Sequence, residues 1–297
     1  MSQPIEFYKL RDFGAKMNAT VEFLRANMGR LFLNLLLIGG PLALLLSILF
    51  GNIFSTFADI GYEAGETGDI SAMGGAFAFL GGNYFLMMIV SWLATSMIIT
   101  VTYTYIRLYN EGVAKETSIG DVFKLAMKKY GGVLLLGFLV AFVTLFGMMF
   151  FVLPGIYLGV TLSLAAPIYM FEDTSATTAF SRSFKLIREK WWSTFGLIFV
   201  TVLMAYVVQM VFSLPFAAVY VVNIFTLVEE SANNPNPSEV LDMFTNGYMT
   251  AAMAISMVGS YLTYCIPLIG LGYQYANLVE RSEGRGLMNE IADFDKE

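Results

Sequence analysis

The sequence predicts an all-α integral membrane protein with about six transmembrane helices. Of the 297 residues, 57% are hydrophobic and only 13% are charged, and the mean hydropathy is +0.66. A soluble domain carries about 25% charged residues, because its surface must be covered with polar groups. Several long apolar tracts have no charged face at all, so they do not fit the amphipathic helices of a soluble core.

Hydropathy and turn residues together place the six spans. We expect them at about 31–52, 83–107, 132–152, 155–171, 191–213 and in a last segment that ends near residue 279. Gly39-Gly40-Pro41 should bend the first span. Pro215 and Pro267 are candidate hinges of the third hairpin. The apolar residues around these prolines could lengthen both helices beyond the bilayer, kink them or re-enter it.

The charged residues predict the orientation of the chain. If six spans alternate, all seventeen Lys and Arg fall on one side together with fifteen acidic residues, which gives a net charge of +2 there. The other side, with a net charge of −8, has eight acidic residues: Asp59, Glu63, Glu66, Asp69, Glu229, Glu230, Glu239 and Asp242. The positive-inside rule makes the basic side cytoplasmic. We therefore expect a multi-pass protein of a prokaryotic cytoplasmic (inner) membrane, with both termini in the cytoplasm and no nucleic acid partner.

A short basic, amphipathic segment precedes each expected hairpin, at about 13–28, 119–130 and 180–191. In the first segment, Lys16 lies on the polar face, opposite an apolar stripe that includes Phe13, Met17 and Met28. These patterns are typical of helices in the headgroup plane, although any basic segment before a membrane helix resembles them. Contacts with anionic lipid headgroups or with a protein partner in a membrane complex are expected at five basic residues: Lys124, Lys128, Arg182, Lys185 and Arg188.

This repeated order suggests an internal organisation within a single polytopic domain, 1–297. The letters of 123–128 (FKLAMK) resemble those of 180–185 (FSRSFK), while the first segment matches too weakly to compare. We interpret the chain as three units, each an in-plane helix followed by a transmembrane hairpin. They cover 1–110, 111–173 and 174–281, and 282–297 form a cytoplasmic tail.

The sequence offers little for catalysis. It has no His and one Cys, so it lacks the commonest catalytic base and the residues for a disulfide. The expected spans contain no ionisable residue away from their ends, where pumps and intramembrane enzymes carry one. Ser96, Thr100 and Thr104 form a polar track, which either lines a pore or, as we favour, bonds to helix carbonyls. We expect no enzyme activity, no cofactor and no metal.

Small residues on the fourth span predict a close helix crossing. Gly155, Gly159 and Ser163 recur every four residues and follow Pro154. Ridges of this kind let two backbones approach each other in a membrane. The alternative interpretation is a dimer face.

The same region resembles a known group of proteins. Its motifs are 153–158 (LPGIYL), 165–167 (AAP), Glu172, 179–186 (AFSRSFKL) and 191–192 (WW). They resemble uncharacterised bacterial and archaeal polytopic proteins, including the membrane domain attached to some glycerophosphoryl diester phosphodiesterases. The resemblance covers roughly 130–200 and implies a membrane fold, with Pro154, Gly155 and the Arg182–Lys185 helix as its signature. It implies no activity, since the chemistry of those enzymes belongs to a separate soluble barrel with His and Glu residues.

Two functions remain open from the sequence. We favour a non-catalytic scaffold or accessory subunit of a cytoplasmic-membrane assembly, because the loops are small and the cytoplasmic face is basic. The alternative is a transporter or flippase-like protein that uses the proline-broken third hairpin as a gate, since broken helices mark substrate sites in many transporters.

Overall fold

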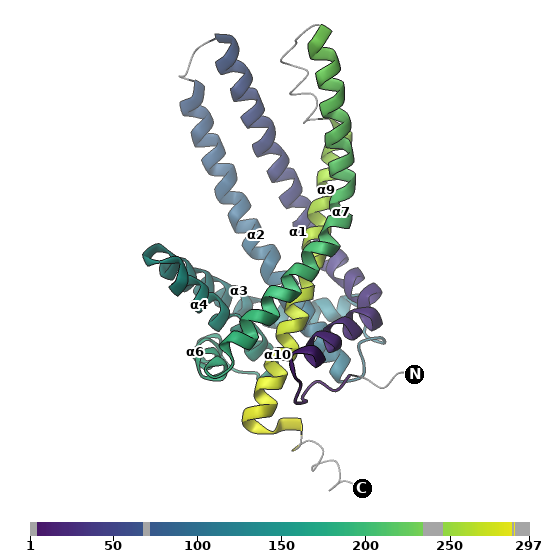
Figure 1. Ribbon diagram of the computed structural model, residues 1–297, viewed down its shortest axis with the longest axis vertical. Coiled ribbons are helices and arrows are strands. Elements are labelled where there is room, and N and C mark those ends of the chain that lie inside the picture. Colours follow the sequence, from purple (N-terminus) through teal and green to yellow (C-terminus); the bar gives the residue numbers. More distant parts are fainter. Residues whose placement is uncertain (1–4, 68–71, 234–245, 287, 289–297) are drawn as a thin grey trace. The chain divides into compact units, whose positions relative to one another are not determined.

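The described part of the chain consists of helices and connecting segments, with no strand. The structure is a computed structural model, and it describes residues 5–67, 72–233, 246–286 and 288 (Figure 1). The helices are α1 (Phe13–Thr67), α2 (Ala72–Asn110), α3 (Ile119–Phe150), α4 (Val152–Leu162), α5 (Ala165–Phe171), α6 (Ala176–Ile187), α7 (Trp191–Asn233), α9 (Gly247–Thr263) and α10 (Cys265–Glu283). The prediction of an all-α fold is confirmed for these residues.

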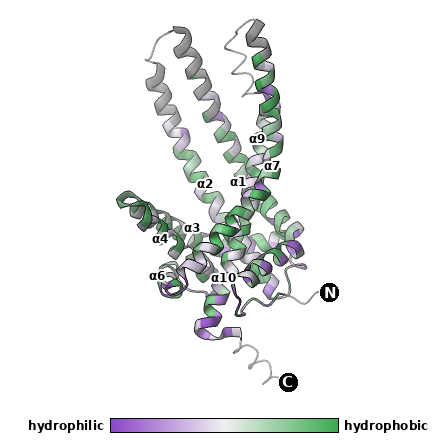
Figure 2. Cartoon of the chain, in the orientation of Figure 1, coloured by the Kyte–Doolittle hydropathy of each residue, from purple (hydrophilic) through white to green (hydrophobic). Residues whose placement is uncertain are grey.

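Within the described ranges, six helical segments are long and apolar enough to cross a membrane, as the sequence predicted. They are Phe13–Ile53, Gly81–Asn110, Ile119–Phe150, Val152–Phe171, Trp191–Thr226 and Gly247–Glu283. The more apolar segments are the less buried ones. In the most apolar 18-residue stretch of Ile119–Phe150, 17% is buried, against 61% in the corresponding stretch of Gly247–Glu283. Figure 2 shows the strongly hydrophobic colouring of α3 and α7. This inverse relation is expected when the exposed helix faces meet lipid rather than water.

The amphipathic segments differ from the expected separate helices. The first two are the N-terminal turns of α1 and α3, which continue without interruption into the apolar spans. The third is a separate helix, α6, which Ser175 caps by accepting a hydrogen bond from the amide of Thr178. Whether these segments lie in a headgroup plane stays a prediction.

Two prolines lie inside helices without ending them. α1 continues through Pro41, and α7 continues through Pro215 to Asn233. Which of the three forms considered the third hairpin takes stays a prediction. The interruption in the last span falls at Tyr264, between α9 and α10. Pro267 is the third residue of α10. The N–H groups of the first helical turn make no intrahelical hydrogen bond, so a proline there removes none.

Contacts divide the chain into two compact units. Unit 1 contains 1–38, 96–205 and 264–297, and unit 2 contains 39–95 and 206–263. The boundaries cut through α1, α2 and α7, so the units differ from the three consecutive segments expected along the sequence. One boundary falls between Ile38 and Gly39, at the Gly-Gly-Pro sequence that was expected to bend the first span.

Within unit 2, α9 contacts each of the other helical segments. The Tyr261 hydroxyl donates to the carbonyl of Ala94 on α2 at 2.7 Å, and the Gln209 amide on α7 donates to the carbonyl of Ser256 at 3.1 Å. Gly39 on α1 faces the ring of Tyr261 so closely that a Cβ there would lie 2.5 Å from its hydroxyl oxygen. Polar side chains of this unit thus bond to backbone groups of neighbouring helices.

Within unit 1, α10 is the central helix. Every residue from Cys265 to Val279 is buried, although this stretch includes Gln274 and Asn277. Aromatic rings surround it: Phe171 lies 5.6 Å from Tyr275 and 4.9 Å from Phe7, measured between ring centroids. A helix enclosed by protein can carry polar residues that a lipid-facing helix cannot, provided that they find partners.

Small residues bring α3 and α4 close together. A Cβ at Gly155 would lie 2.1 Å from Met148 Cγ and 2.9 Å from the Met148 backbone nitrogen, so this glycine cannot be replaced without moving the helices apart. At Gly159 a Cβ would lie 3.4 Å from Thr144 Cγ2, which is a milder restriction. Ser163 Oγ donates to the carbonyl of Val160 on its own helix, and Pro154 is exposed in the first turn of α4. The closest approach is thus at Gly155, near one end of the expected ridge.

The expected polar face of α1 is wrong at Lys16. Lys16 is 3% exposed, whereas Glu22 and Arg25 of the same face are exposed, as expected. From the expected apolar stripe, Phe13 and Met28 are each 42% exposed. These exceptions have a physical reason: at the membrane, apolar groups can face lipid, and polar groups must find partners inside the protein.

Candidate functional site

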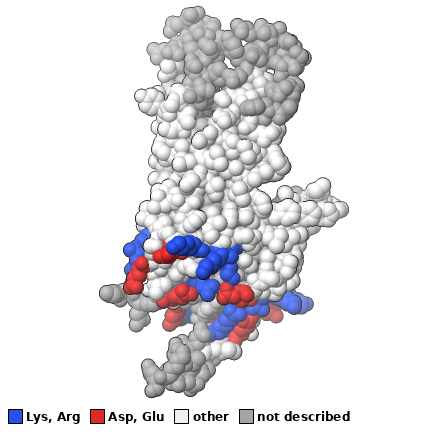
Figure 3. Space-filling model, turned by 180° about the vertical axis from the view of Figure 1, so that it is seen from behind, with Lys and Arg blue, Asp and Glu red and all other residues white. Residues whose placement is uncertain are grey.

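Charge is distributed unequally between the two units. All seventeen Lys and Arg belong to the residues of unit 1, and unit 2 contains none. Figure 3 shows the charged side chains of the described residues gathered at one end of unit 1. The eight acidic residues expected on the other side fall in unit 2, and their side chains lie outside the described part of the chain. The charged side chains that could form a functional site therefore belong to unit 1.

A nearly buried carboxylate organises this charged end. Glu172 directly follows α5, and its side chain is only 8% exposed. Arg182 Nε of α6 lies 2.5 Å from Glu172 Oε2, and Arg285 lies 3.8 Å from Glu172 Oε1. The Tyr275 hydroxyl of α10 donates to Glu172 Oε1 at 3.0 Å. A buried charge needs such partners to offset its loss of hydration.

The ion pairs close into a cluster of two acids and two bases. Glu283, at the end of α10, pairs with Arg182 through one carboxylate oxygen and with Arg285 through the other, at 2.9 Å. Arg182 thus holds Glu172 and Glu283 at once, and it joins α6 to the ends of α5 and α10. Its charge is therefore already neutralised by carboxylates of the protein.

The neighbouring acid, Asp173, makes weaker contacts at the surface. It accepts from Lys129 Nζ at 2.7 Å and from Arg107 at 3.5 Å, and its side chain is 60% exposed. The hydrogen bond from Lys129 lowers the pKa of the Asp173 carboxyl. Its φ of 48° lies in the left-handed region, which Asp tolerates better than most residues.

A second buried charge is Lys16, whose contacts are all neutral. The residue is 3% exposed, and its Nζ donates to Gln274 Oε1 at 2.6 Å and to Ser193 Oγ at 3.0 Å. The amide nitrogen of Gln274 donates in turn to Thr194 Oγ1 at 2.8 Å. This chain of contacts joins α1, α7 and α10. Sequence analysis placed Lys16 on a solvated face, and no local pattern could reveal that α10 covers it.

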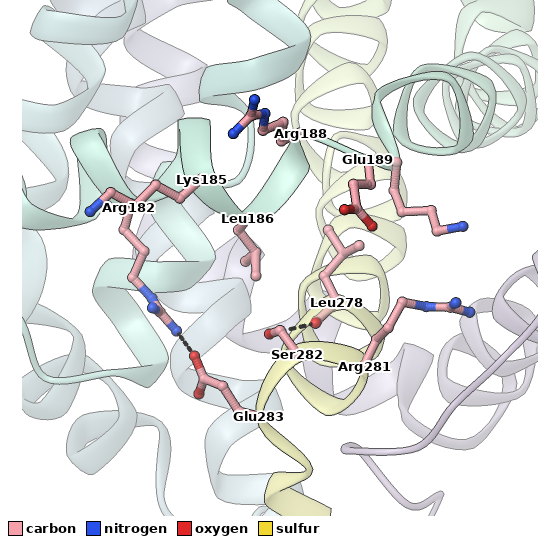
Figure 4. Close-up of a pocket in the computed structure, with 10 residues that line it drawn as sticks. Arg182, Lys185, Leu186, Arg188, Glu189, Leu278, Arg281, Ser282 and Glu283 are labelled. Carbon is pink, nitrogen blue, oxygen red and sulfur yellow. Dashed lines mark hydrogen bonds and ion pairs between the residues drawn. The ribbon is translucent and has the colours of Figure 1, made fainter.

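Next to these clusters is an open groove of about 430 Å³ between α6, the start of α7 and the end of α10 (Figure 4). We call it the α6–α10 groove. It is lined by Arg182, Lys185, Leu186, Arg188, Glu189, Lys190, Leu278, Arg281, Ser282 and Glu283. Five of these side chains are cationic and two are carboxylates, so the lining has a net charge of +3.

The structure brings together three of the five expected contact residues. Arg182, Lys185 and Arg188 line the α6–α10 groove, but Arg182 is occupied by its ion pairs. Lys128 lines a different pocket of about 230 Å³, and Lys124 is exposed and pairs with Asp121 at 3.5 Å. On α6 itself, the buried residues are Ala176, Ala179, Ser183 and Ile187, and Phe180 and Phe184 are half-buried.

Sequence reasoning missed Arg281 and Lys190 as members of the groove. Lys190 lies three residues after the end of α6, so its place in the sequence could have indicated that it belongs with Lys185 and Arg188. Arg281 is almost a hundred residues away, on α10. The groove can attract and hold an anion, since it offers several cationic side chains in one concave surface. Among the described residues, no group of three His, Cys, Asp or Glu could hold a metal ion.

Comparison with known proteins identifies the family of the chain. A family model matches residues 122–276, which is more than half of the sequence. The chain belongs to the family described as domain of unknown function (DUF7847). The DUF7847 region contains Glu172, Arg182 and Gln274, but Lys16, Arg281 and Glu283 lie outside it. Neither the curated proteins nor the solved structures gave a match. The resemblance to phosphodiesterase membrane domains remains a prediction.

Proposed function

We propose that this DUF7847 protein is a non-catalytic scaffold or accessory subunit of an assembly in a prokaryotic cytoplasmic membrane, with both termini in the cytoplasm. The observation that carries the proposal is the use of buried charge. Glu172 and Lys16 each contact side chains from other segments of unit 1. A general acid or base must instead reach a substrate, and these groups serve to join helices.

The exposed surface of the spans supports the membrane location. Phe138, Phe142 and Phe146 on α3 are 56%, 59% and 54% exposed, and their rings stack at centroid distances of 6.2 and 6.4 Å. A continuous aromatic stripe of this kind is unfavourable in water and suits acyl chains. The partition of Lys and Arg supports the orientation, because the basic unit would face the cytoplasm. The same basic residues would meet anionic headgroups there.

The alternative of a transporter or flippase-like protein has weaker support. In the polar track of Ser96, Thr100 and Thr104, Thr100 Oγ1 donates to the Ser96 carbonyl of its own helix at 2.6 Å, and Thr104 lines the pocket of about 230 Å³. α7 is unbroken at Pro215, and the break at Tyr264 leaves its neighbours buried. The scaffold role therefore fits the geometry better.

Labelling of single cysteines tests the orientation. In a Cys265→Ala background, Lys185→Cys and Lys128→Cys should react with an impermeant maleimide only after cell lysis, because they belong to the basic unit. Asp69→Cys and Asn236→Cys should react in intact cells. Alanine is chosen at position 265 because the thiol is fully buried, and a serine hydroxyl there would need a partner. Reaction of Lys185→Cys in intact cells would overturn the proposed topology.

Copurification tests the role. The full chain, extracted from its native membrane in a mild detergent, should retain at least one other protein in fixed stoichiometry. The control is an unrelated multi-pass protein of the same membrane, prepared identically. A chain that runs alone through gel filtration and, in liposomes, moves lipid or solute across the bilayer would contradict the scaffold role and support the transporter.

A further inference from the structure

Four of the five cations of the α6–α10 groove have no ion-pair partner in the described part of the chain. Arg182 and Glu283 pair with each other across the groove, as Figure 4 marks. Among the described residues, no carboxylate lies within 4.0 Å of a nitrogen of the remaining cations: Lys185, Arg188, Lys190 and Arg281. Glu189 is the only other acidic residue in the lining. The groove therefore holds a cluster of like charges whose mutual repulsion is not relieved within the described residues.

A buried charge behind the groove adds to this repulsion. Lys190 and Arg281 are close enough to Lys16 for their charges to repel it, and Asp12 offsets this repulsion only in part. The hydrogen bonds of Lys16 go to the neutral Gln274 and Ser193. The cations Lys16, Lys190 and Arg281 thus lie near one another in unit 1. Their repulsion costs free energy when no ligand is bound, and an anion that binds there would reduce this cost.

We propose that the α6–α10 groove binds the phosphate of an anionic phospholipid headgroup. Phosphate suits the available donors, since Arg281 and Arg188 can each bind two of its oxygens and the two Lys supply point charges. A lipid is favoured over a soluble phosphate by the surroundings. Leu186 and Leu278 lie in the same lining, and Trp192, two residues after Lys190, is 78% exposed, as is typical of aromatic residues at headgroup level. This site goes beyond the scaffold role and does not depend on it.

Lipid titration of the purified full chain tests the site. In a non-ionic detergent, short-chain phosphatidylglycerol should raise the melting temperature in a saturable manner, whereas phosphatidylcholine of the same chain length should not. Lys190→Gln/Arg281→Gln should weaken the apparent affinity by about 30-fold, at roughly fivefold for each charge near an anionic group. The matched control is Lys9→Gln/Lys115→Gln, which removes two exposed charges outside the groove and outside the five expected contact residues, and it should leave the affinity unchanged.

Three results would overturn the proposal. Equal binding of both lipids would mean that the phosphate charge is not recognised. Equal loss in the control variant would mean that net charge alone attracts the lipid. Saturable binding of inorganic phosphate or pyrophosphate, with phosphatidylglycerol unable to compete, would assign the groove to a soluble ligand.

The melting temperature without lipid separates binding from folding. Since Lys190→Gln/Arg281→Gln relieves repulsion, its lipid-free melting temperature should equal or exceed that of the wild type. A clear decrease would show that these cations stabilise the fold, against the proposal. Lys185→Gln/Arg188→Gln, on two exposed residues of the same groove, provides a second variant that should also lose affinity.

Discussion

Glu172→Ala is expected to destabilise the folded chain by roughly 3 kcal/mol, at the lower end of what breaking a buried ion pair costs. The carboxylate is nearly buried, and it accepts from Tyr275 and pairs with both Arg182 and Arg285. Without it, two guanidinium groups that are 29% and 33% exposed depend on Glu283 alone. Their partial exposure and this remaining partner keep the loss below that of a fully buried pair. An unfolding titration in mixed micelles measures the change in the free energy of unfolding.

The neighbouring residue provides the control. Asp173→Ala also removes a carboxylate with two basic partners, Lys129 and Arg107, but its side chain is 60% exposed. Surface ion pairs contribute about 0–1 kcal/mol, so this variant should be close to the wild type. If both variants lose the same free energy, the burial of Glu172 is not what matters. If neither does, the cluster does not hold α5, α6 and α10 together.

The number of spans could be predicted from the sequence, because hydropathy over about 20 residues is a local property. The extents of α1 and α7 could not be predicted. Their apolar residues continue well past the thickness of a bilayer, and Pro41 and Pro215 do not end them.

The charged end of unit 1 was predicted only in part. Lys185 and Arg188 were identified because they lie on one amphipathic segment, and that pattern is visible in the sequence. Arg281 comes from a helix almost a hundred residues away, and no pattern within either segment reports that the two meet. Arg182 shows the opposite error: its position predicts a headgroup contact, but Glu172 and Glu283 occupy it. Local sequence identifies a charge, whereas tertiary packing decides its partner.

Lys16 illustrates why helix periodicity misleads at a membrane. The usual rule puts the apolar stripe inside and the charge outside. Here Phe13 and Met28 are exposed and Lys16 is buried, so the rule is wrong at these three positions of α1, although it is right for the exposed Glu22 and Arg25. Applied with lipid as the surrounding medium, the same physics predicts the burial of Lys16, because a charge is best placed where hydrogen-bonding partners are available.

Gln274→Leu is the second change with a large expected effect. Gln274 Oε1 accepts from Lys16 Nζ at 2.6 Å and its amide nitrogen donates to Thr194, so leucine removes both contacts in the buried centre of unit 1. Lys16 then retains the hydroxyl of Ser193 as its acceptor. A buried charge that loses a partner costs about 3–5 kcal/mol, and we expect a loss near the lower value because one acceptor remains.

The matched variants separate the charge from the shape of the side chains. Lys16→Met keeps a long apolar side chain and removes the charge, but it leaves the buried Gln274 Oε1 without its donor, so it should cost about 1–3 kcal/mol. Lys16→Met/Gln274→Leu should recover most of the stability lost by Gln274→Leu, since the buried cation is no longer present. Double-mutant analysis of unfolding in mixed micelles then gives the coupling between the two residues. If the double variant is as unstable as Gln274→Leu alone, the loss arises from the packing of leucine or from Thr194, and the Lys16 contact does not stabilise the junction of α1, α7 and α10.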